Sequence, residues 1–460
     1  MPTTLRFLGG ASEVGRIGAV LEGDNGSLLL DYGLQPDDPP KFPLPAPEVD
    51  ALLLTHAHLD HCGLVPKIAS RGTPVVSTPV TGDLAERMAQ DTLRVAEIEN
   101  YPIPFHKSAI SDLVQNHRSI LPGNVEYRGG FEFNVYNAGH IPGAVMFNFP
   151  QDDFLFTGDI HTVNTQLTRA AKPHPCKTLA IESTYGGREH PDRIETEKEL
   201  LDSVEDVVNK GGQVVLPSFG LGRSQELLML VEKLGVEVWL DGMGRDIARI
   251  LQKYPGSIRD FGGMNKAYRN TNFVKYARQR KAAMRGDVIV TTSGMLNGGP
   301  VLHYLSEIRK NPSSAVFLTG FQVPGTNGHM LKETGKLRLE RGDSSPPVDV
   351  NCQLKSFDLS GHAGHSQIVD FINKCNPEKV ILYHGDNRQA FKEDLKDYEV
   401  ILPMENETIE IDYVSSIWLS GPINIRIIPN KRKKMSEVKT MPYGPCNSIE
   451  SCICPSLVDK

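Results

Sequence analysis

Four side chains of metal-binding type cluster directly behind a run of leucines. The stretch LLLTHAHLDHCGL, residues 52–64, contains His56, His58, Asp60 and His61. On an extended segment, side chains two positions apart point the same way, so His56 and His58 can converge. Imidazole and carboxylate are ligands that zinc prefers, and catalytic zinc sites keep one position open for water. The stretch therefore predicts a site for one metal ion, or for two close together, in preference to a polar turn with incidental histidines.

Three more polar residues stand where apolar runs end. His140 ends the run in YNAGHIPGAV, Asp159 ends the run in FLFTGDI, and Asp31 follows the leucines of LLLDYG. A carboxylate has two oxygens and can bridge two ions, so Asp159 is a candidate bridge. Asp31 is expected to orient either a ligand histidine or the entry turn from behind. Each of the three alone could be an ordinary turn residue, but together with the histidine stretch they extend the predicted metal site.

The elements that would position these side chains follow from the spacing of apolar residues. In the first half, short β-type runs alternate with turn residues, and one long helix is expected at 81–99. The β-type runs lie at 26–33, 50–58, 72–79, 131–140, 144–149, 153–160 and 178–186. This half predicts a layered, sheet-rich core with helices outside. From about residue 190, helices alternate with strands, which indicates an open and mostly parallel sheet.

Composition narrows the class of protein. A chain of 460 residues, 39% hydrophobic and 23% charged, is expected to form two or three globular domains. No apolar run is long enough for a membrane span and no signal peptide is recognisable, so the expected location is the cytoplasm. Seven scattered cysteines argue for reduced thiols. A net charge of -7 means that any nucleic-acid site must be local.

The motifs carry a resemblance to a known family. Asp31, THAHLDH, His140 and Asp159 resemble, in order, the motifs of the metallo-β-lactamase fold. Three later motifs are similar to those of the β-CASP nucleases, which include ribonuclease J and the cleavage and polyadenylation specificity factor endonuclease: IESTYGG with Glu182, LSGHAGH with His362, and LYHGD with His384. The resemblance covers roughly residues 5 to 413. It is closest to archaeal proteins of this kind that lack KH domains.

The resemblance implies an α/β fold, with a metallo-β-lactamase αββα sandwich and an inserted β-CASP domain built on a parallel sheet. The implied division is a first lactamase part at 1–190, the β-CASP domain at 191–364, and a lactamase return at 365–413. Residues 414–460 are basic and then rich in cysteine, serine and proline, and they are expected to form a flexible tail.

The resemblance also implies the roles of the site residues. One zinc ion is expected at His56, His58 and His140, a second at Asp60, His61 and His384, and Asp159 between them. His362 is the expected general acid and Glu182 its carboxylate partner, with His365 as the alternative acid. Asp60 is counted among the catalytic residues as well as the ligands.

The function implied is that of a zinc-dependent ribonuclease. It would hydrolyse RNA phosphodiester bonds as an endonuclease, a 5′-3′ exonuclease or both, in RNA processing or decay. Two alternatives remain open: a small-molecule metallohydrolase of the thioesterase or lactonase type, and a catalytically inert RNA-binding scaffold.

Substrate contacts are expected in glycine-rich loops and on one basic stretch. The loops are LPSFGLGRSQE, TTSGMLNGG and TGFQVPGTNG, and their candidate residues are Ser218, Gly220, Arg223, Ser293, Gly294 and Gly325. Residues 245–285 hold eleven Lys/Arg against two acidic residues, interleaved with aromatics, which suits single-stranded RNA. Plain tight turns and a solvated helix face are the alternatives. A homodimer is considered as well, and no membrane partner is expected.

Overall fold

The computed structural model describes residues 2–340 and 346–411. Two seven-stranded sheets build the part that carries the histidine stretch. The first sheet runs in the order β22 (Thr408–Glu410), β1 (Thr4–Gly9), β2 (Gly18–Gly23), β3 (Gly26–Tyr32), β4 (Ala51–Leu53), β5 (Val75–Ser77) and β6 (His117–Ser119). The second runs in the order β21 (Glu399–Ile401), β20 (Lys379–Tyr383), β11 (Thr178–Glu182), β10 (Phe154–Phe156), β9 (Val145–Phe149), β8 (Phe131–Asn137) and β7 (Val125–Arg128).

The two sheets share one apolar core. Alternate residues of β8 and β9 place Phe133, Phe147 and Phe149 in the same buried cluster as Phe7 and Leu30 of the first sheet. This is the period-two burial of a strand with one face against a core. Because β20 and β21 pair in parallel beside β11, a segment from beyond residue 378 completes the second sheet.

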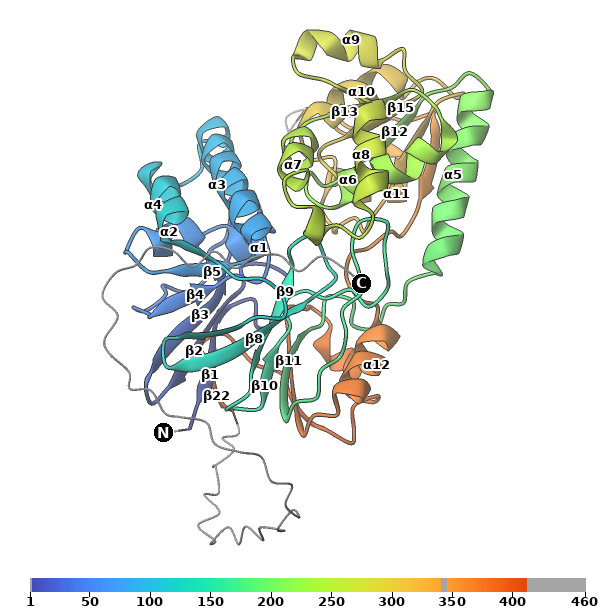
Figure 1. Cartoon of the computed structure of the whole chain (residues 1–460). Coiled ribbons are helices and arrows are strands. Elements are labelled where there is room, and N and C mark those ends of the chain that lie inside the picture. The colour runs from blue at the N-terminus through green and yellow to red at the C-terminus, as the bar shows by residue number, and fades with distance from the viewer. Residues whose placement is uncertain (1, 341–345, 412–460) are drawn as a thin grey trace, which may run out of the picture. The chain divides into compact units, whose positions relative to one another are not determined.

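Helices cover the outer faces of both sheets (Figure 1). Over the first sheet lie α1 (Leu59–Cys62), α2 (Val65–Ala69), α3 (Pro79–Glu99) and α4 (Ser108–Asn116), and over the second lies α12 (His365–Cys375). The long helix α3 begins where Thr78 accepts a hydrogen bond from the Thr81 N–H, with proline in the first turn. It ends at Asn100 in the left-handed conformation. The layers form the expected αββα sandwich.

The third sheet is entirely parallel. Its order is β14 (Thr271–Phe273), β13 (Val238–Asp241), β15 (Val288–Thr291), β12 (Val214–Pro217), β16 (Ala315–Leu318) and β19 (Gln353–Ser356). Its helices are α5 (Arg193–Asn209), α6 (Arg223–Val231), α7 (Gly244–Leu251), α8 (Phe261–Asn270), α9 (Arg280–Ala283), α10 (Pro300–Ile308) and α11 (Asn327–Thr334). A small pair, β17 (Lys336–Leu337) and β18 (Val348–Asp349), lies outside this sheet. Short 3₁₀ turns occur at η1 (Glu232–Leu234), η2 (Pro255–Ser257), η3 (Ala277–Gln279) and η4 (Arg388–Phe391). The loops after β12, β15 and β16 therefore share one edge, where α/β sheets bind ligands.

One boundary differs from the expectation in a way that affects the site. The β-type run expected at 50–58 is a strand only over Ala51–Leu53, so His56 and His58 lie in the loop that follows. The next helix begins early, at Leu59, and includes Asp60 and His61. The ligand stretch thus leaves the sheet before it turns into a helix. In the part of the chain that is described, no helix is both long and apolar enough to cross a membrane.

Candidate metal centre

The loop between β4 and α1 is held against the first sheet by a close backbone approach. The N–H of Ile17 donates to the carbonyl of Asp60 at 2.7 Å. A side chain at Gly33 is excluded, because a Cβ there would lie 1.7 Å from the Asp60 carbonyl oxygen. Glycine at this position therefore lets the histidine stretch pack directly on the end of β3.

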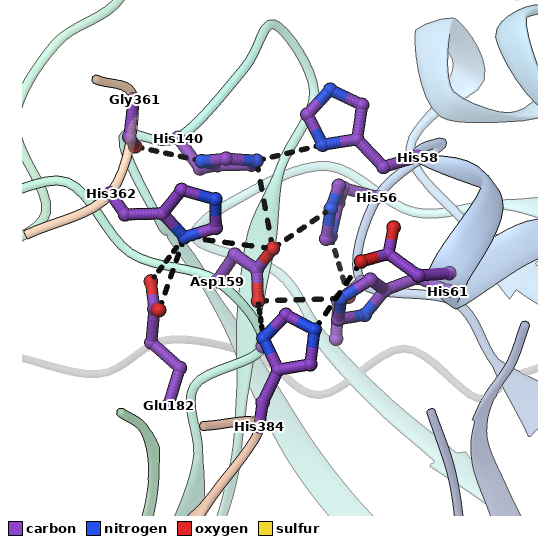
Figure 2. Close-up of polar contacts among 12 residues, drawn as sticks. His56, His58, His61, His140, Asp159, Glu182, Gly361, His362 and His384 are labelled. Carbon is purple, nitrogen blue, oxygen red and sulfur yellow. Dashed lines mark hydrogen bonds and ion pairs between the residues drawn. The ribbon is translucent and has the colours of Figure 1, made fainter. Parts of the chain in front are cut away.

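The first cluster of ligand atoms gathers around one oxygen of Asp159. His56 Nε2 lies 3.5 Å and His140 Nε2 lies 3.6 Å from Asp159 Oδ2. His58 Nδ1 is 2.9 Å from His140 Nε2. Figure 2 shows these side chains pointing toward one another, and one ligand atom from each of the four lies within 4.8 Å of the others. This set could hold one ion.

The second cluster gathers around the other oxygen of Asp159. His61 Nε2 lies 3.3 Å and His384 Nδ1 lies 3.2 Å from Asp159 Oδ1. His384 Nε2 is 3.3 Å from Asp60 Oδ2. Asp159 thus faces both clusters with a different oxygen (Figure 2), which is the geometry of a carboxylate between two ions.

Unpartnered buried atoms show that the donor set fits cations. His56 Nε2, His61 Nε2 and Asp159 Oδ1 are buried without a hydrogen bond in the described structure, a costly state that an ion would relieve. Burial lowers the pKa of His56 and His140, which favours neutral imidazoles with a lone pair to donate. Burial also acts to lower the pKa of His384, but nearby carboxylates outweigh it and raise the pKa to about 10. The excess negative charge responsible for that shift would equally stabilise a metal cation.

Hydrogen bonds from behind orient the histidines. His61 Nδ1 donates to Asp31 at 2.7 Å, which leaves Nε2 to face the cluster. The Thr55 hydroxyl donates to Asp31 at 2.7 Å and lies 3.0 Å from His56 Nδ1, so the ring N–H of His56 donates to Thr55. Asp31 therefore orients His61, a member of the second cluster. Thr55 was missed, although it directly precedes the first histidine.

His140 and His384 are fixed by the backbone. His140 Nδ1 donates to the carbonyl of Gly361 at 2.7 Å, so its Nε2 faces the first cluster. His384 has a φ of 53° and Asp31 a φ of 56°, a left-handed conformation that residues other than glycine seldom adopt. Such strain persists where surrounding contacts hold it, typically at functional sites.

His362 and Glu182 form a pair beside the first cluster. His362 Nδ1 lies 3.0 and 3.1 Å from the two Glu182 oxygens and 3.9 Å from Asp159 Oδ2. Glu182 is fully buried and also accepts the Ile160 N–H at 2.8 Å. Burial by itself lowers the pKa of His362, but Glu182 and Asp159 outweigh it and raise that pKa. The pair is therefore suited to hold a proton on the imidazole.

The alternative histidine lies elsewhere. His365 begins α12, where its Nδ1 accepts the Gly187 N–H at 2.9 Å and its Nε2 lies 2.9 Å from Asp394. These contacts occupy both ring nitrogens. Within the described residues, His365 belongs to none of the ligand clusters.

The glycine-rich loops meet at the carboxyl edge of the third sheet. The Ser218 N–H after β12 donates to Thr291 of β15 at 2.9 Å. The Gln322 amide after β16 donates to the Gly294 carbonyl at 3.2 Å. The loops after these three strands are therefore neighbours, as a shared substrate surface requires.

Individual side chains in these loops are less available than expected. The Ser218 hydroxyl is buried 2.8 Å from that of Ser224. The Arg223 guanidinium is largely buried and pairs with Glu226 at 3.0 Å. These groups stabilise the loop after β12, so its contact with a ligand would depend mainly on backbone.

The other candidate loop residues differ in exposure. Gly220 and Gly294 are buried, Ser293 is half-buried with its hydroxyl on the Gly298 carbonyl, and Gly325 is exposed. A Cβ at Gly325 would meet no atom within 4 Å. Gly325 is therefore the most open of the candidates.

A row of aromatic side chains beside His362 was not predicted from the sequence. The Tyr185 ring centroid lies 6.0 Å from that of His362 and 6.5 Å from that of Phe321. Arg188 covers the half-exposed Phe321 ring at 4.3 Å. Tyr185 and Phe321 both stand inside the motifs IESTYGG and TGFQVPGTNG, so the signal was present but was not interpreted.

Comparison with known families agrees with this architecture. Residues 19–218 match the metallo-beta-lactamase superfamily, residues 224–331 the Beta-Casp domain, and residues 347–410 the Zn-dependent metallo-hydrolase RNA specificity domain.

Archaeal proteins align over most of the chain. "Probable RNase MJ4" of Methanocaldococcus jannaschii is 32% identical over 84% of this chain and 93% of its own length. "RNase aCSPSF2" of Saccharolobus solfataricus is 34% identical over 88% of this chain and 85% of its own length. The M. jannaschii "Transcription termination factor FttA" is 32% identical over 84% of this chain and 67% of its own length.

A solved structure supports the fold alone. The crystal structure of a protein of unknown function from Enterococcus faecalis V583 aligns with a TM-score of 0.56 and 15% identity, covering 89% of this chain and all of that chain. The resemblance expected from the motifs is confirmed by the family matches and the archaeal relatives. The chain therefore belongs to the β-CASP family of metallo-β-lactamase-type, metal-dependent hydrolases.

Proposed function

We propose that this protein is a two-zinc ribonuclease that hydrolyses phosphodiester bonds of RNA. The observation that carries the proposal is a pair of clusters that face the two oxygens of Asp159. The His362–Glu182 pair lies beside them and also borders Asp159. The names of the archaeal RNases and of the matched RNA specificity domain support RNA, rather than a thioester or lactone, as the substrate.

The ligand assignment follows the two clusters. One ion would be held by His56, His58 and His140 and the other by Asp60, His61 and His384, with Asp159 shared. Zinc is chosen because histidine and carboxylate are the donors it prefers. When bound, such ions polarise a phosphate and lower the pKa of an attacking water.

The protein's own acid would act on the leaving group. Cleavage breaks the bond between phosphorus and the 3′-oxygen, and that oxygen needs a proton. His362 can donate it because Glu182 and Asp159 raise the pKa of its imidazole, which favours the protonated form. Water then returns a proton to His362 before the next turnover. Asp60 would contribute as a ligand of the second ion, with its Oδ2 3.3 Å from His384 Nε2.

We further propose the division into a lactamase part at 1–190, a β-CASP domain at 191–364 and a lactamase return at 365–413. The expected tail at 414–460 lies outside the described residues. Preference for single-stranded RNA, a homodimer and a cytoplasmic location stay predictions.

A labelled-substrate assay tests the function. Single-stranded RNA labelled at the 5′ end or the 3′ end is incubated with the protein, with and without chelator, and with zinc restored. We expect chelator-sensitive cleavage that zinc rescues. Early mononucleotides from the 5′ label would indicate exonuclease action, and internal fragments would indicate endonuclease action. The proposal would be refuted if the zinc-loaded protein does not cleave RNA but hydrolyses members of a thioester panel.

A further inference from the structure

A basic cavity lies between α7 and α8, outside the metal centre. It has a volume of about 230 Å³, and the lining residues that matter here are Arg249, Gln252, Tyr268, Arg269, Phe273 and Lys275. Three of its side chains are cationic, and none of the described residues that line it is acidic. Its charge therefore favours an anion.

Two of the three cations of this cavity, Arg269 and Lys275, are left unpaired among the described residues, unlike their neighbours. Lys266 pairs with Glu232 at 2.8 Å and Arg280 with Asp241 at 2.7 Å, so much of the basic stretch is neutralised internally. Arg269 and Lys275 form no ion pair with any described residue. Arg249 reaches Asp246 only at 3.9 Å, and its side chain is 61% exposed.

A buried hydroxyl adds an independent sign of a ligand. Tyr268 lines the cavity and is only 4% exposed, yet its hydroxyl has no hydrogen-bond partner among the described residues. A buried polar group without a partner is costly and calls for an explanation. The hydroxyl oxygen has almost no accessible surface, so it lies just beneath the cavity wall, and a small shift of the ring would let it donate a hydrogen bond to an oxyanion in the cavity.

We propose that the cavity binds a backbone phosphate of single-stranded RNA at a position remote from the scissile bond. The guanidinium groups and the ammonium group supply the charge, and the Tyr268 hydroxyl would add a directed hydrogen bond once its ring shifts toward the phosphate. The half-buried Phe273 ring gives an apolar wall for a sugar or base. The inference rests on the proposed function for the identity of the polymer.

The placement of α7 favours RNA over a free anion. The Gln225 amide bonds both the Gly220 carbonyl, in the loop after β12, and the Gly244 carbonyl at the start of α7, at 2.9 and 3.0 Å. Arg249 stands five positions further along, about 7.5 Å of helix rise. A strand that passes the glycine-rich loop would therefore reach the cavity within a few nucleotides.

Salt-dependent binding tests this site. The first variant is Tyr268→Phe. The second is the double variant Arg269→Ala/Lys275→Ala, which changes two exposed side chains. The matched control is Arg278→Ala/Lys281→Ala, which removes the same charge from exposed positions of the same basic stretch, outside the cavity. Fluorescence anisotropy measures the affinity for phosphorothioate single-stranded RNA, which resists hydrolysis, over a range of salt concentrations. Thermal melting checks that each variant is folded.

The expected result is specific to the cavity. The double variant should flatten the log-log salt slope by about 0.7 for each phosphate that is no longer neutralised, and the control should match the parent. Tyr268→Phe should weaken binding severalfold with an unchanged slope. A cavity double variant that matches the parent or the control in slope would overturn the proposal.

Two further measurements test whether the site is remote from the scissile bond and whether it binds RNA or a small anion. Hydrolysis of a dinucleotide, too short to reach the cavity, should be unchanged in the variants, and a loss there would count against a remote site. Inorganic phosphate at constant ionic strength should compete with RNA in the parent. Altered phosphate binding with an unchanged RNA slope would mean that the cavity takes a small anion instead. Failure of the parent to cleave RNA would refute the proposed function while the binding result still stood.

Discussion

The metal centre and the basic surface of the third sheet are built on opposite principles. In the centre, most of the clustered side chains are buried, and several are oriented by a group behind them, as His61 is by Asp31 and His140 by Gly361. On the surface, Arg269 and Lys275 are exposed and unpaired within the described structure. Bond-making chemistry needs atoms fixed to a fraction of an ångström, whereas attraction of a flexible polyanion needs only charge in the right region.

The largest effect on the metal centre is expected from changing Asp159, which faces both clusters. Asp159→Asn preserves shape but removes the charge between the clusters, so we expect both ions and nearly all turnover to be lost. Metal analysis by mass spectrometry should fall from about two ions per chain to near zero. A folded Asp159→Asn protein that retains both ions would show that Asp159 does not bridge them.

Removing a ligand from one cluster should affect one ion only. His384→Ala should lose roughly one of two zinc ions while the sandwich stays folded, because His384 belongs to the second cluster. His365→Ala is the matched control, since that histidine contacts Asp394 instead of the clusters. Equal metal content in the two variants would make the ligand assignment wrong.

Changing the proposed proton donor, His362, should lower turnover without changing metal content. His362→Ala should keep both ions and bind RNA normally, while turnover falls by about 10² to 10⁴, the range for a positioned general acid. Glu182→Gln should cause part of this loss, and the double variant should be little worse than His362→Ala alone, because the two act as one unit. Losses that multiply would show independent roles, and loss of zinc in His362→Ala would make that histidine a ligand.

The orienting carboxylate should matter less than a ligand. Asp31→Asn weakens the hydrogen bond that aligns His61, so zinc affinity should fall by about 10 to 100-fold. Competition with a chromophoric chelator measures this. Asp37→Asn, which alters only an exposed pair with Lys41, should leave the affinity unchanged. The same drop in both variants would point to net charge rather than orientation.

The smallest effect is expected in the loop after β12. Ser218→Ala removes a buried hydroxyl that pairs with Ser224, so stability should fall by about 1 kcal/mol in denaturant unfolding. KM for RNA should not change, because the hydroxyl does not face solvent. A raised KM with unaltered stability would restore Ser218 as a direct substrate contact.

The sequence by itself determined the metallo-β-lactamase sandwich, its parallel-sheet partner and the family. It also selected the side chains that the structure gathers around Asp159. The family, the sandwich and the roles of the later motif residues came from the resemblance of ordered motifs, whereas apolar periodicity, a local property, predicted the layered sheet-rich half and the parallel sheet. The basic stretch at 245–285 was identified as well, but its composition could not separate cations paired internally, such as Arg280, from the free ones.

Only the tertiary structure decided which groups meet across the chain. It brought His362 to Glu182 from 180 positions away, and it assigned both nitrogens of His365 to other partners. It left the Tyr268 hydroxyl without a partner among the described residues. These outcomes depend on how sheets and helices pack, and packing is set by the summed contacts of residues far apart in sequence, which no local pattern records.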